Sequence, residues 1–222
     1  MDLTTIIPVC IAVIILIVTL VIRHEKKRTG LLQQMASVRG FFFAVKSDLN
    51  ILPPQAGELH LFKRGHTRRI NNLLQKPVDP VTEMIFDYTY VTGSGRNRYT
   101  HKQTVYLFQD SRNELPGFEL RPEHFFHKIG QTFGYQDIDF DSHPEFSKKY
   151  ILRAKNEEMI RKLMTPDLIA AFEKEKGIST ECAGHLLIIY WSGKRIAPDQ
   201  IFEVHDRVQR IHLALSGRNN FI

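Results

Sequence analysis

Residues 83–92 read Glu-Met-Ile-Phe-Asp-Tyr-Thr-Tyr-Val-Thr, and residues 99–109 read Tyr-Thr-His-Lys-Gln-Thr-Val-Tyr-Leu-Phe-Gln. Both stretches are rich in β-branched and aromatic residues, which favour strands. Between them, Gly93, Ser94 and Gly95 are residues typical of a turn. The pattern predicts two antiparallel strands joined by this turn.

Shorter elements are expected on both sides of this pair. Residues 59–63 and 69–74 suggest a second hairpin around Gly65. Strands first, then helices mixed with strands, predict an α+β domain with an antiparallel sheet. Further strands are expected at 118–120, 148–154 and 185–192, and helices at 122–130, after a Ser142 cap, at 156–164 and at 165–177.

The C-terminal helix has the clearest helical pattern in the soluble part. Pro198 suits its first turn and Gly217 suits its end. Apolar residues at spacings of three and four form one stripe, which makes the helix amphipathic and is expected to pack on the sheet. These residues are Ile201, Val204, Val208, Ile211 and Leu215.

The N-terminus carries a long apolar stretch. Residues 3–22 have no charged side chain, and a helix of about 20 residues spans the ~30 Å hydrocarbon core of a bilayer. A cleaved signal peptide is the alternative, but the stretch is too long and lacks a basic start and a small-residue cleavage site. We expect a transmembrane anchor at 1–23, a juxtamembrane helix and linker at 24–57, and a cytoplasmic domain at 58–222.

Positive charge is concentrated near this anchor. The 222 residues carry a net charge of +6, whereas residues 23–76 alone hold 11 basic and 3 acidic residues. Because basic flanks stay in the cytoplasm, we expect the N-terminus outside and the domain inside. The cytoplasmic leaflet is anionic and attracts such residues. Those expected to contact its lipid headgroups are Arg23, Lys26, Lys27, Arg28, Lys63, Arg64, Arg68 and Arg69.

The composition excludes several classes of protein. With 43% hydrophobic and 24% charged residues, the chain is neither disordered nor of low complexity. Two cysteines cannot form a disulfide framework. The basic stretch lacks helix-turn-helix, zinc-finger and aromatic RNA-binding patterns, so nucleic acid is not an expected partner.

Five segments of the chain come in a recognisable order: Phe86–Tyr90, Gln103–Val105, Leu115–Glu123, Asp137–Phe140 and Pro144–Tyr150. The chain resembles a broad group of bacterial proteins, which has a small membrane anchor and one soluble α+β domain, over about residues 59–215. The resemblance implies a bacterial origin and a single domain, and it implies no activity, substrate or catalytic residue. With a bacterial origin, the expected anchor lies in the inner membrane.

The main candidate for chemistry lies between residues 137 and 143. In an extended strand, Asp137, Asp139, Asp141 and His143 would share one face, and oxygen-rich clusters of this kind bind Ca²⁺ or Mg²⁺. However, the glycine and final glutamate of an EF-hand loop are missing. We therefore expect solvated aspartates with buried apolar residues between them, and neither a metal nor another cofactor.

Two other groups were weighed as sites. Glu123, His124 and His127 can share a helix face, but they do not form the H-E-x-x-H zinc pattern. Cys182 and His185 resemble a thiol nucleophile and its base, but no third group orients them. We therefore assign no catalytic residue.

These features favour a non-enzymatic interaction domain that is anchored in the membrane and binds a protein partner. A membrane-tethered hydrolase or metal-dependent enzyme that uses Asp137–His143 is the alternative. Recognition of anionic lipid headgroups as the main function is a weaker alternative. A deep cleft that joins Asp139, Asp141 and a histidine would favour the enzyme.

Overall fold

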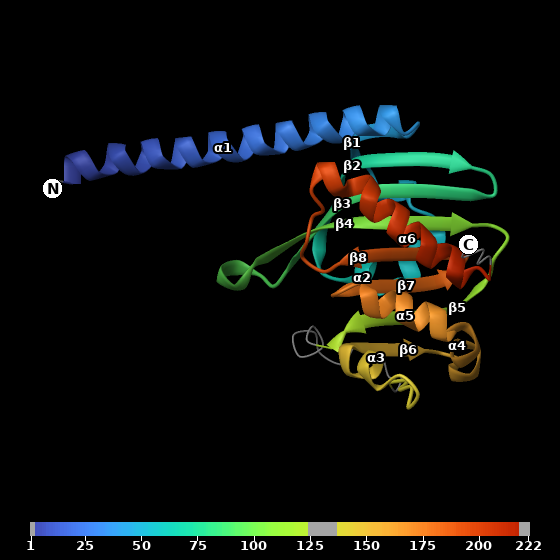
Figure 1. The fold of residues 1–222 in the computed structure, drawn as a ribbon. Coiled ribbons are helices and arrows are strands. Elements are labelled where there is room, and N and C mark those ends of the chain that lie inside the picture. The colour runs from blue at the N-terminus through green and yellow to red at the C-terminus, as the bar shows by residue number, and fades with distance from the viewer. Residues whose placement is uncertain (1–2, 124–136, 218–222) are drawn as a thin grey trace.

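The computed structural model describes residues 3–123 and 137–217. Within these residues, eight strands form a sheet in the order β1-β2-β3-β4-β8-β7-β5-β6, and all neighbours are antiparallel (Figure 1). The predicted α+β class is therefore confirmed. The strands are β1 (Phe42–Ser47), β2 (His66–Val78), β3 (Val81–Thr92), β4 (Tyr99–Asp110), β5 (Leu115–Pro122), β6 (Tyr150–Ala154), β7 (Ile178–Gly184) and β8 (Leu186–Trp191).

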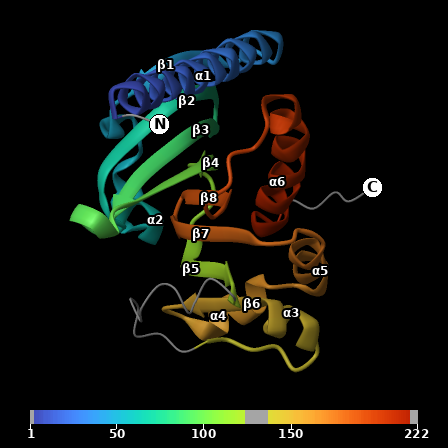
Figure 2. The same ribbon diagram turned by 90° about the vertical axis from the view of Figure 1, so that its left-hand side faces the viewer.

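Helices lie on both faces of the sheet (Figure 2). On one face, a hydrophobic cluster includes Leu32, Phe172 and Val208 from three different helices. On the other face, Leu61 and Phe62 of a short helix belong to a second cluster. The helices are α1 (Leu3–Val38), α2 (His60–Lys63), α3 (Pro144–Lys149), α4 (Glu157–Leu163), α5 (Pro166–Lys174) and α6 (Ile201–Leu215).

Helix α1 has two parts with different surroundings. Its N-terminal half projects away from the sheet, and apolar side chains such as Ile14 and Leu16 are about 60% exposed (Figure 1). In the described part of the chain, this helix is long and apolar enough to span a membrane, with a mean hydropathy of 2.5. Its C-terminal half lies on the sheet, where Leu32 and Ala36 are buried. The helix therefore fits the predicted single membrane anchor.

The end of α1 differs from the prediction. Gly40 adopts a φ of 71°, and the N–H of Phe41 donates to the carbonyl of Ala36 at 2.8 Å. This left-handed glycine cap ends the helix and reverses the chain. β1 then pairs with β2, although residues 24–57 were predicted to contain only a helix and a linker. The sheet thus begins before the predicted domain start at residue 58.

The central hairpin and the C-terminal stripe are confirmed. Thr92 of β3 lies opposite Tyr99 of β4, as the turn between the two predicted strands requires. In α6, all five residues of the predicted stripe are buried, and Val208 is fully buried. The hydroxyl of Tyr106 also donates to the carbonyl of Ile201 at 3.0 Å, which ties the start of α6 to β4.

Three local predictions are wrong. Residues 59–63 were expected to form a strand, but they contain helix α2, in which three consecutive residues are buried. Pro122 ends β5 rather than opening a helix; the rest of that predicted helix lies largely outside the described residues. The N-cap of α3 is His143 rather than Ser142, and its side chain makes no capping hydrogen bond.

Candidate functional site

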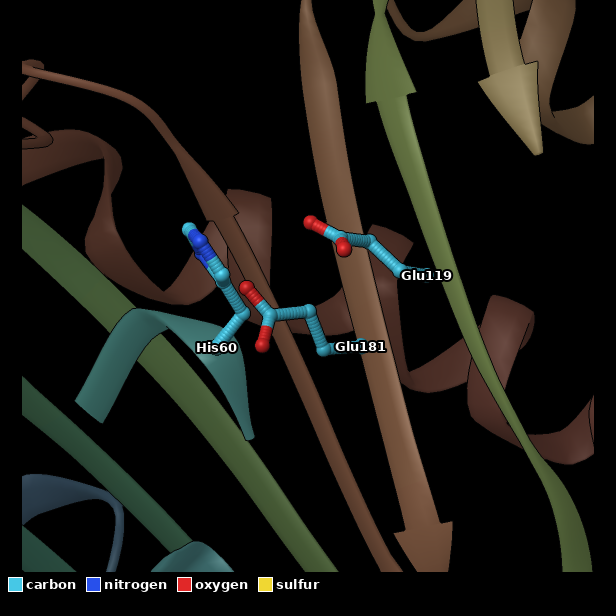
Figure 3. A group of neighbouring side chains, drawn as sticks. All are labelled: His60, Glu119 and Glu181. Carbon is cyan, nitrogen blue, oxygen red and sulfur yellow. The ribbon is translucent and has the colours of Figure 1, made fainter. Parts of the chain in front are cut away.

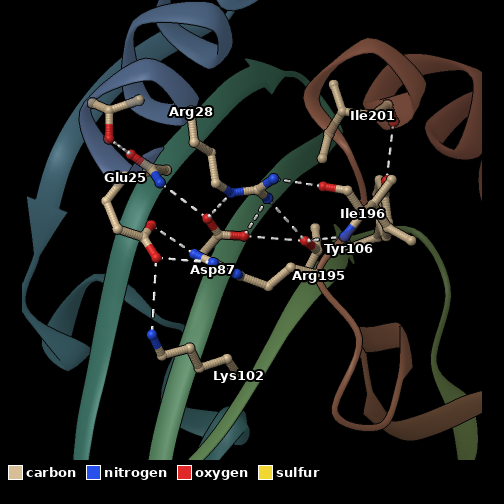
Figure 4. Close-up of polar contacts among 11 residues, drawn as sticks. Glu25, Arg28, Asp87, Lys102, Tyr106, Arg195, Ile196 and Ile201 are labelled. Atoms are coloured by element: carbon tan, nitrogen blue, oxygen red, sulfur yellow. Dashed lines mark hydrogen bonds and ion pairs between the residues drawn. The ribbon is translucent and has the colours of Figure 1, made fainter. Parts of the chain in front are cut away.

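A buried ion pair joins the anchor helix to the sheet. Arg28 of α1 is only 6% exposed. Its Nε and Nη2 donate to the two carboxylate oxygens of Asp87 in β3 at 2.8 and 2.7 Å (Figure 4). Its Nη1 donates to the carbonyl oxygen of Ile196 at 2.7 Å. This paired geometry is the strong form of an arginine–carboxylate contact. Arg28 was predicted to contact lipid, and its burial corrects that prediction.

The carboxylate of Asp87 has two further donors. Asn72 Nδ2 lies 2.9 Å from Oδ2, and the hydroxyl of Thr104 lies 3.1 Å from Oδ1. Asn72 in turn accepts a hydrogen bond from the hydroxyl of Thr29 in α1 at 2.8 Å. Buried charges are tolerated only when they are paired and hydrogen-bonded, and both conditions are met here. The network thus fixes α1 to β2, β3 and β4.

A second ion pair lies outside this network, closer to solvent. Arg195 donates to both carboxylate oxygens of Glu25 at 2.7 and 2.9 Å. Lys102 of β4 also lies 3.8 Å from Glu25 (Figure 4). The hydrogen bonds from Arg195 lower the pKa of Glu25, so this carboxylate stays ionised at neutral pH. We call the contacts of Glu25 and Arg28 together the helix junction.

A cavity of about 480 Å³ lies beside α2 and over β5 and β7. Glu181, at its edge, is 2% exposed. Its carboxylate accepts hydrogen bonds from the N–H of Leu61 at 3.1 Å and from the hydroxyl of Tyr190 at 2.7 Å. His60 and Glu119 point toward the same place (Figure 3). We call His60, Glu119 and Glu181 the carboxylate cluster.

The carboxylate cluster was tested as a metal site. One ligand atom from each residue lies within 4.8 Å of the others, and the donors are of the type that zinc prefers. However, the guanidinium of Arg121 contacts all three side chains and lies 3.4 Å from Glu181. This cation already pairs with both carboxylates. A metal ion would have to displace Arg121, so the residues present do not fit a metal.

Burial and the nearby charge of Arg121 lower the pKa of His60 to about 3. His60 is therefore neutral at pH 7, and protonation favours the unfolded chain. Its contribution to stability is fully present above the ordinary pKa of 6.5 and is lost as the pH falls toward about 3. We expect the His60→Gln variant to lose less stability than the wild type between pH 7 and pH 4.

Denaturant unfolding of the full chain in detergent at the two pH values measures this difference. His24→Gln is the matched control because His24 is exposed. Its loss of stability between pH 7 and pH 4 should equal that of the wild type. If His60→Gln loses as much stability as the wild type between pH 7 and pH 4, the buried neutral histidine does not cause the loss of stability in acid.

The structure does not bring the predicted Asp137–His143 residues into a metal site. Asp137, Asp139 and Asp141 are exposed, and His143 is half-buried. Asp137 accepts a hydrogen bond from the N–H of Leu152 at 2.8 Å, which is a structural use of its side chain. Within residues 3–123 and 137–217, the possible metal ligands that lie close together are those of the carboxylate cluster. The apolar residues between the aspartates are buried, as predicted.

The other two candidate sites are not supported as catalytic groups or lie outside the described residues. His124 and His127 fall outside the described residues. Cys182 is buried, and burial raises the pKa of its thiol to about 12, so it is not a thiolate at neutral pH. The Nδ1 of His185 lies 2.7 Å from the carbonyl oxygen of Asn113, in the connection between β4 and β5.

The other predicted lipid contacts differ in exposure. Arg23, Lys26, Lys27, Lys63 and Arg69 are exposed. Two more residues of this set are half-buried and make structural contacts. Arg64 lies 5.4 Å from the centre of the Tyr90 ring, and Arg68 donates to the carbonyls of Lys63 and Gly65 at 2.7 and 3.0 Å.

No protein family and no curated protein matches the sequence. By structure, the chain is similar to the mycobacterial trehalose monomycolate transport factor A, TtfA. The TM-score is 0.58 at 8% sequence identity, and the match covers 88% of this chain and 94% of that chain. The likeness therefore extends over nearly the whole of both proteins, and at this identity it shows a shared fold.

Proposed function

We propose that this chain is a membrane-anchored, non-enzymatic interaction domain that works as an accessory factor in transport at a bacterial inner membrane. The helix junction carries this proposal. Arg28 and Asp87 bind α1 to the sheet by buried hydrogen bonds, so the anchor continues into the domain without a flexible linker. An enzyme that acts on diffusing substrates needs no such fixed orientation. A domain that presents one surface to a neighbouring membrane protein does.

The basic residues support a cytoplasmic position for the domain. Arg23, Lys26 and Lys27 are exposed directly after the apolar stretch, and such residues stay inside. The N-terminus would then lie outside. Lys63 and Arg69 add exposed positive charge that would face anionic lipid headgroups. Arg68 would contribute only in part, because it also holds the turn before β2, and Arg64 only in part, because it lies over the Tyr90 ring.

The structural likeness supports the functional class. TtfA is described as a transport factor, and we extend this class to the present chain by fold-level analogy, since a fold alone does not determine function. The carboxylate cluster gives no competing argument for an enzyme, because Arg121 already contacts all three of its side chains. The partner is thus expected to be a protein of the same membrane.

Inserting Gly-Ser-Gly-Ser between Arg23 and His24 tests the proposal, because it uncouples the membrane span from the helix junction. We expect both the wild type and this variant to stay in the membrane fraction. Affinity purification from membranes should recover a specific partner with the wild type and much less of it with the insertion. The same insertion between Ser111 and Arg112, an exposed turn away from the junction, should have little effect.

Equal recovery of the partner with both insertions would show that a fixed orientation is unnecessary. Recovery of no specific partner with the wild type would remove the interaction function and leave the enzyme as the leading alternative.

A further inference from the structure

The β3–β4 hairpin reaches out from the sheet toward the membrane side. We call residues 93–98 the hairpin tip. In Figure 1, the tip projects on the same side of the sheet as the N-terminal half of α1. The β2 strand also begins at this end, where the Nε2 of His66 lies 3.1 Å from the carbonyl oxygen of Gly93. The tip is therefore at the end of the sheet from which the apolar helix leaves.

One ion pair sets the height of the hairpin relative to α1. The Nζ of Lys102 lies 3.8 Å from a carboxylate oxygen of Glu25, so β4 passes near α1 at these two residues. From Lys102 to Tyr99 the strand advances about 10 Å. From Glu25 to Ile22, the end of the apolar stretch, the helix advances only about 4.5 Å. Because both run toward the same side, the tip reaches the level at which the apolar helix enters the bilayer.

The chemistry of the hairpin tip suits the surface of an anionic bilayer. No acidic residue occurs between Asp87 and Asp110, whereas Arg96 and Arg98 lie at the tip, and both are exposed. Tyr99, at the base of the tip, is 65% exposed. Arginine binds phosphate oxygens in paired geometry, and tyrosine is enriched at membrane–water interfaces.

The tip also has a defined shape. The N–H of Asn97 donates to the carbonyl of Ser94 at 3.1 Å. Gly93 has a φ of 71°, and a Cβ there would collide with the carbonyl oxygen of Asn97. The backbone atoms of the turn therefore face each other. The arginine side chains are left outside, free to contact a flat surface.

We propose that the hairpin tip is a second membrane contact, which binds the phosphate groups of anionic lipids in the same bilayer that holds α1. This inference rests on the anchor of the proposed function and adds a second point of attachment. Together with the helix junction, it would fix the tilt of the sheet relative to the bilayer. A domain held at two points presents its far face in one direction.

Site-directed labelling of the full chain tests this contact. The two natural cysteines, Cys10 and Cys182, are replaced by Ser and Ala. A fluorescent label is attached to Ser94→Cys at the tip, or to Ser111→Cys beyond the other end of β4 as a matched control. The protein is reconstituted in vesicles of phosphatidylcholine, with or without an equal amount of phosphatidylglycerol, that carry a headgroup quencher. We expect strong quenching at position 94 with phosphatidylglycerol and little quenching at position 111.

The paired change Arg96→Gln and Arg98→Gln identifies the groups responsible. Each arginine near an anionic surface strengthens binding about fivefold, so the double change should weaken the contact of the tip roughly thirtyfold. Added salt should weaken it in the wild type as well, because it screens exposed charges. Quenching that persists in the double variant would overturn the phosphate contact.

Two outcomes separate this inference from the proposed function. If the protein floats with the vesicles but the label at position 94 is quenched no more than that at 111, the tip does not touch the bilayer and the inference is wrong. If the protein is washed off the vesicles by alkaline buffer, the anchor itself is wrong, and the inference fails with it. Equal quenching without phosphatidylglycerol would overturn the requirement for anionic lipid.

Discussion

The Val208→Asp variant should be destabilised by about 4 kcal/mol or more, which is enough to unfold many domains. Val208 is fully buried in α6, where it faces the hydrophobic cluster on the sheet. The apolar stripe of α6 contains no lysine or arginine to pair with a new carboxylate, and the neighbouring His205 and His212 already face Glu83 and Asp110. A buried carboxylate without a partner must either stay charged in an apolar site or be protonated, and both cost stability. Denaturant unfolding of the full chain in detergent measures the loss.

Leu213→Asp is the matched control for this change. Leu213 lies in the same helix but is 38% exposed, so its replacement should change the unfolding free energy by about 0.5 kcal/mol or less. If both variants are equally stable, α6 does not pack on the sheet through its stripe.

The stripe could be predicted from the sequence because its signal is local. Helical spacing repeats within 15 residues. The strands of the central hairpin are equally local, since Thr92 and Tyr99 are close in sequence. The edge strand β1 was missed for the opposite reason. Phe42 pairs with Gln75, and no pattern near Phe42 identifies that distant partner.

The polar contacts of both candidate sites were also missed. Arg28 follows the apolar stretch and therefore resembles an ordinary basic flank, while its partner Asp87 is 59 residues away. One signal was available. Asp87 interrupts a strand of apolar and aromatic residues, and a carboxylate in such a strand requires a buried donor or cation. No such signal marks Glu181, because β7 contains no aromatic residue and Ser179 and Thr180 precede the carboxylate.

The Asp87→Ala variant should lose about 3–5 kcal/mol of stability, because it leaves the guanidinium of Arg28 buried without its carboxylate. Arg28 would keep the hydrogen bond to the carbonyl of Ile196, which does not neutralise its charge. Because the pair joins α1 to the sheet, protease cleavage near residues 38–47 should also become faster. Denaturant unfolding and limited proteolysis of the full chain in detergent check both expectations.

Two further variants test whether the loss in Asp87→Ala comes from the unpaired charge of Arg28. Arg195→Met removes the more exposed pair with Glu25, and exposed pairs contribute about 1 kcal/mol or less. The double change Arg28→Met with Asp87→Leu replaces the buried charges by apolar groups, and it should be more stable than Asp87→Ala alone. A loss in Asp87→Ala no greater than that in Arg195→Met would show that the buried pair does not hold the anchor helix on the sheet. The proposed function would then lose the observation on which it depends.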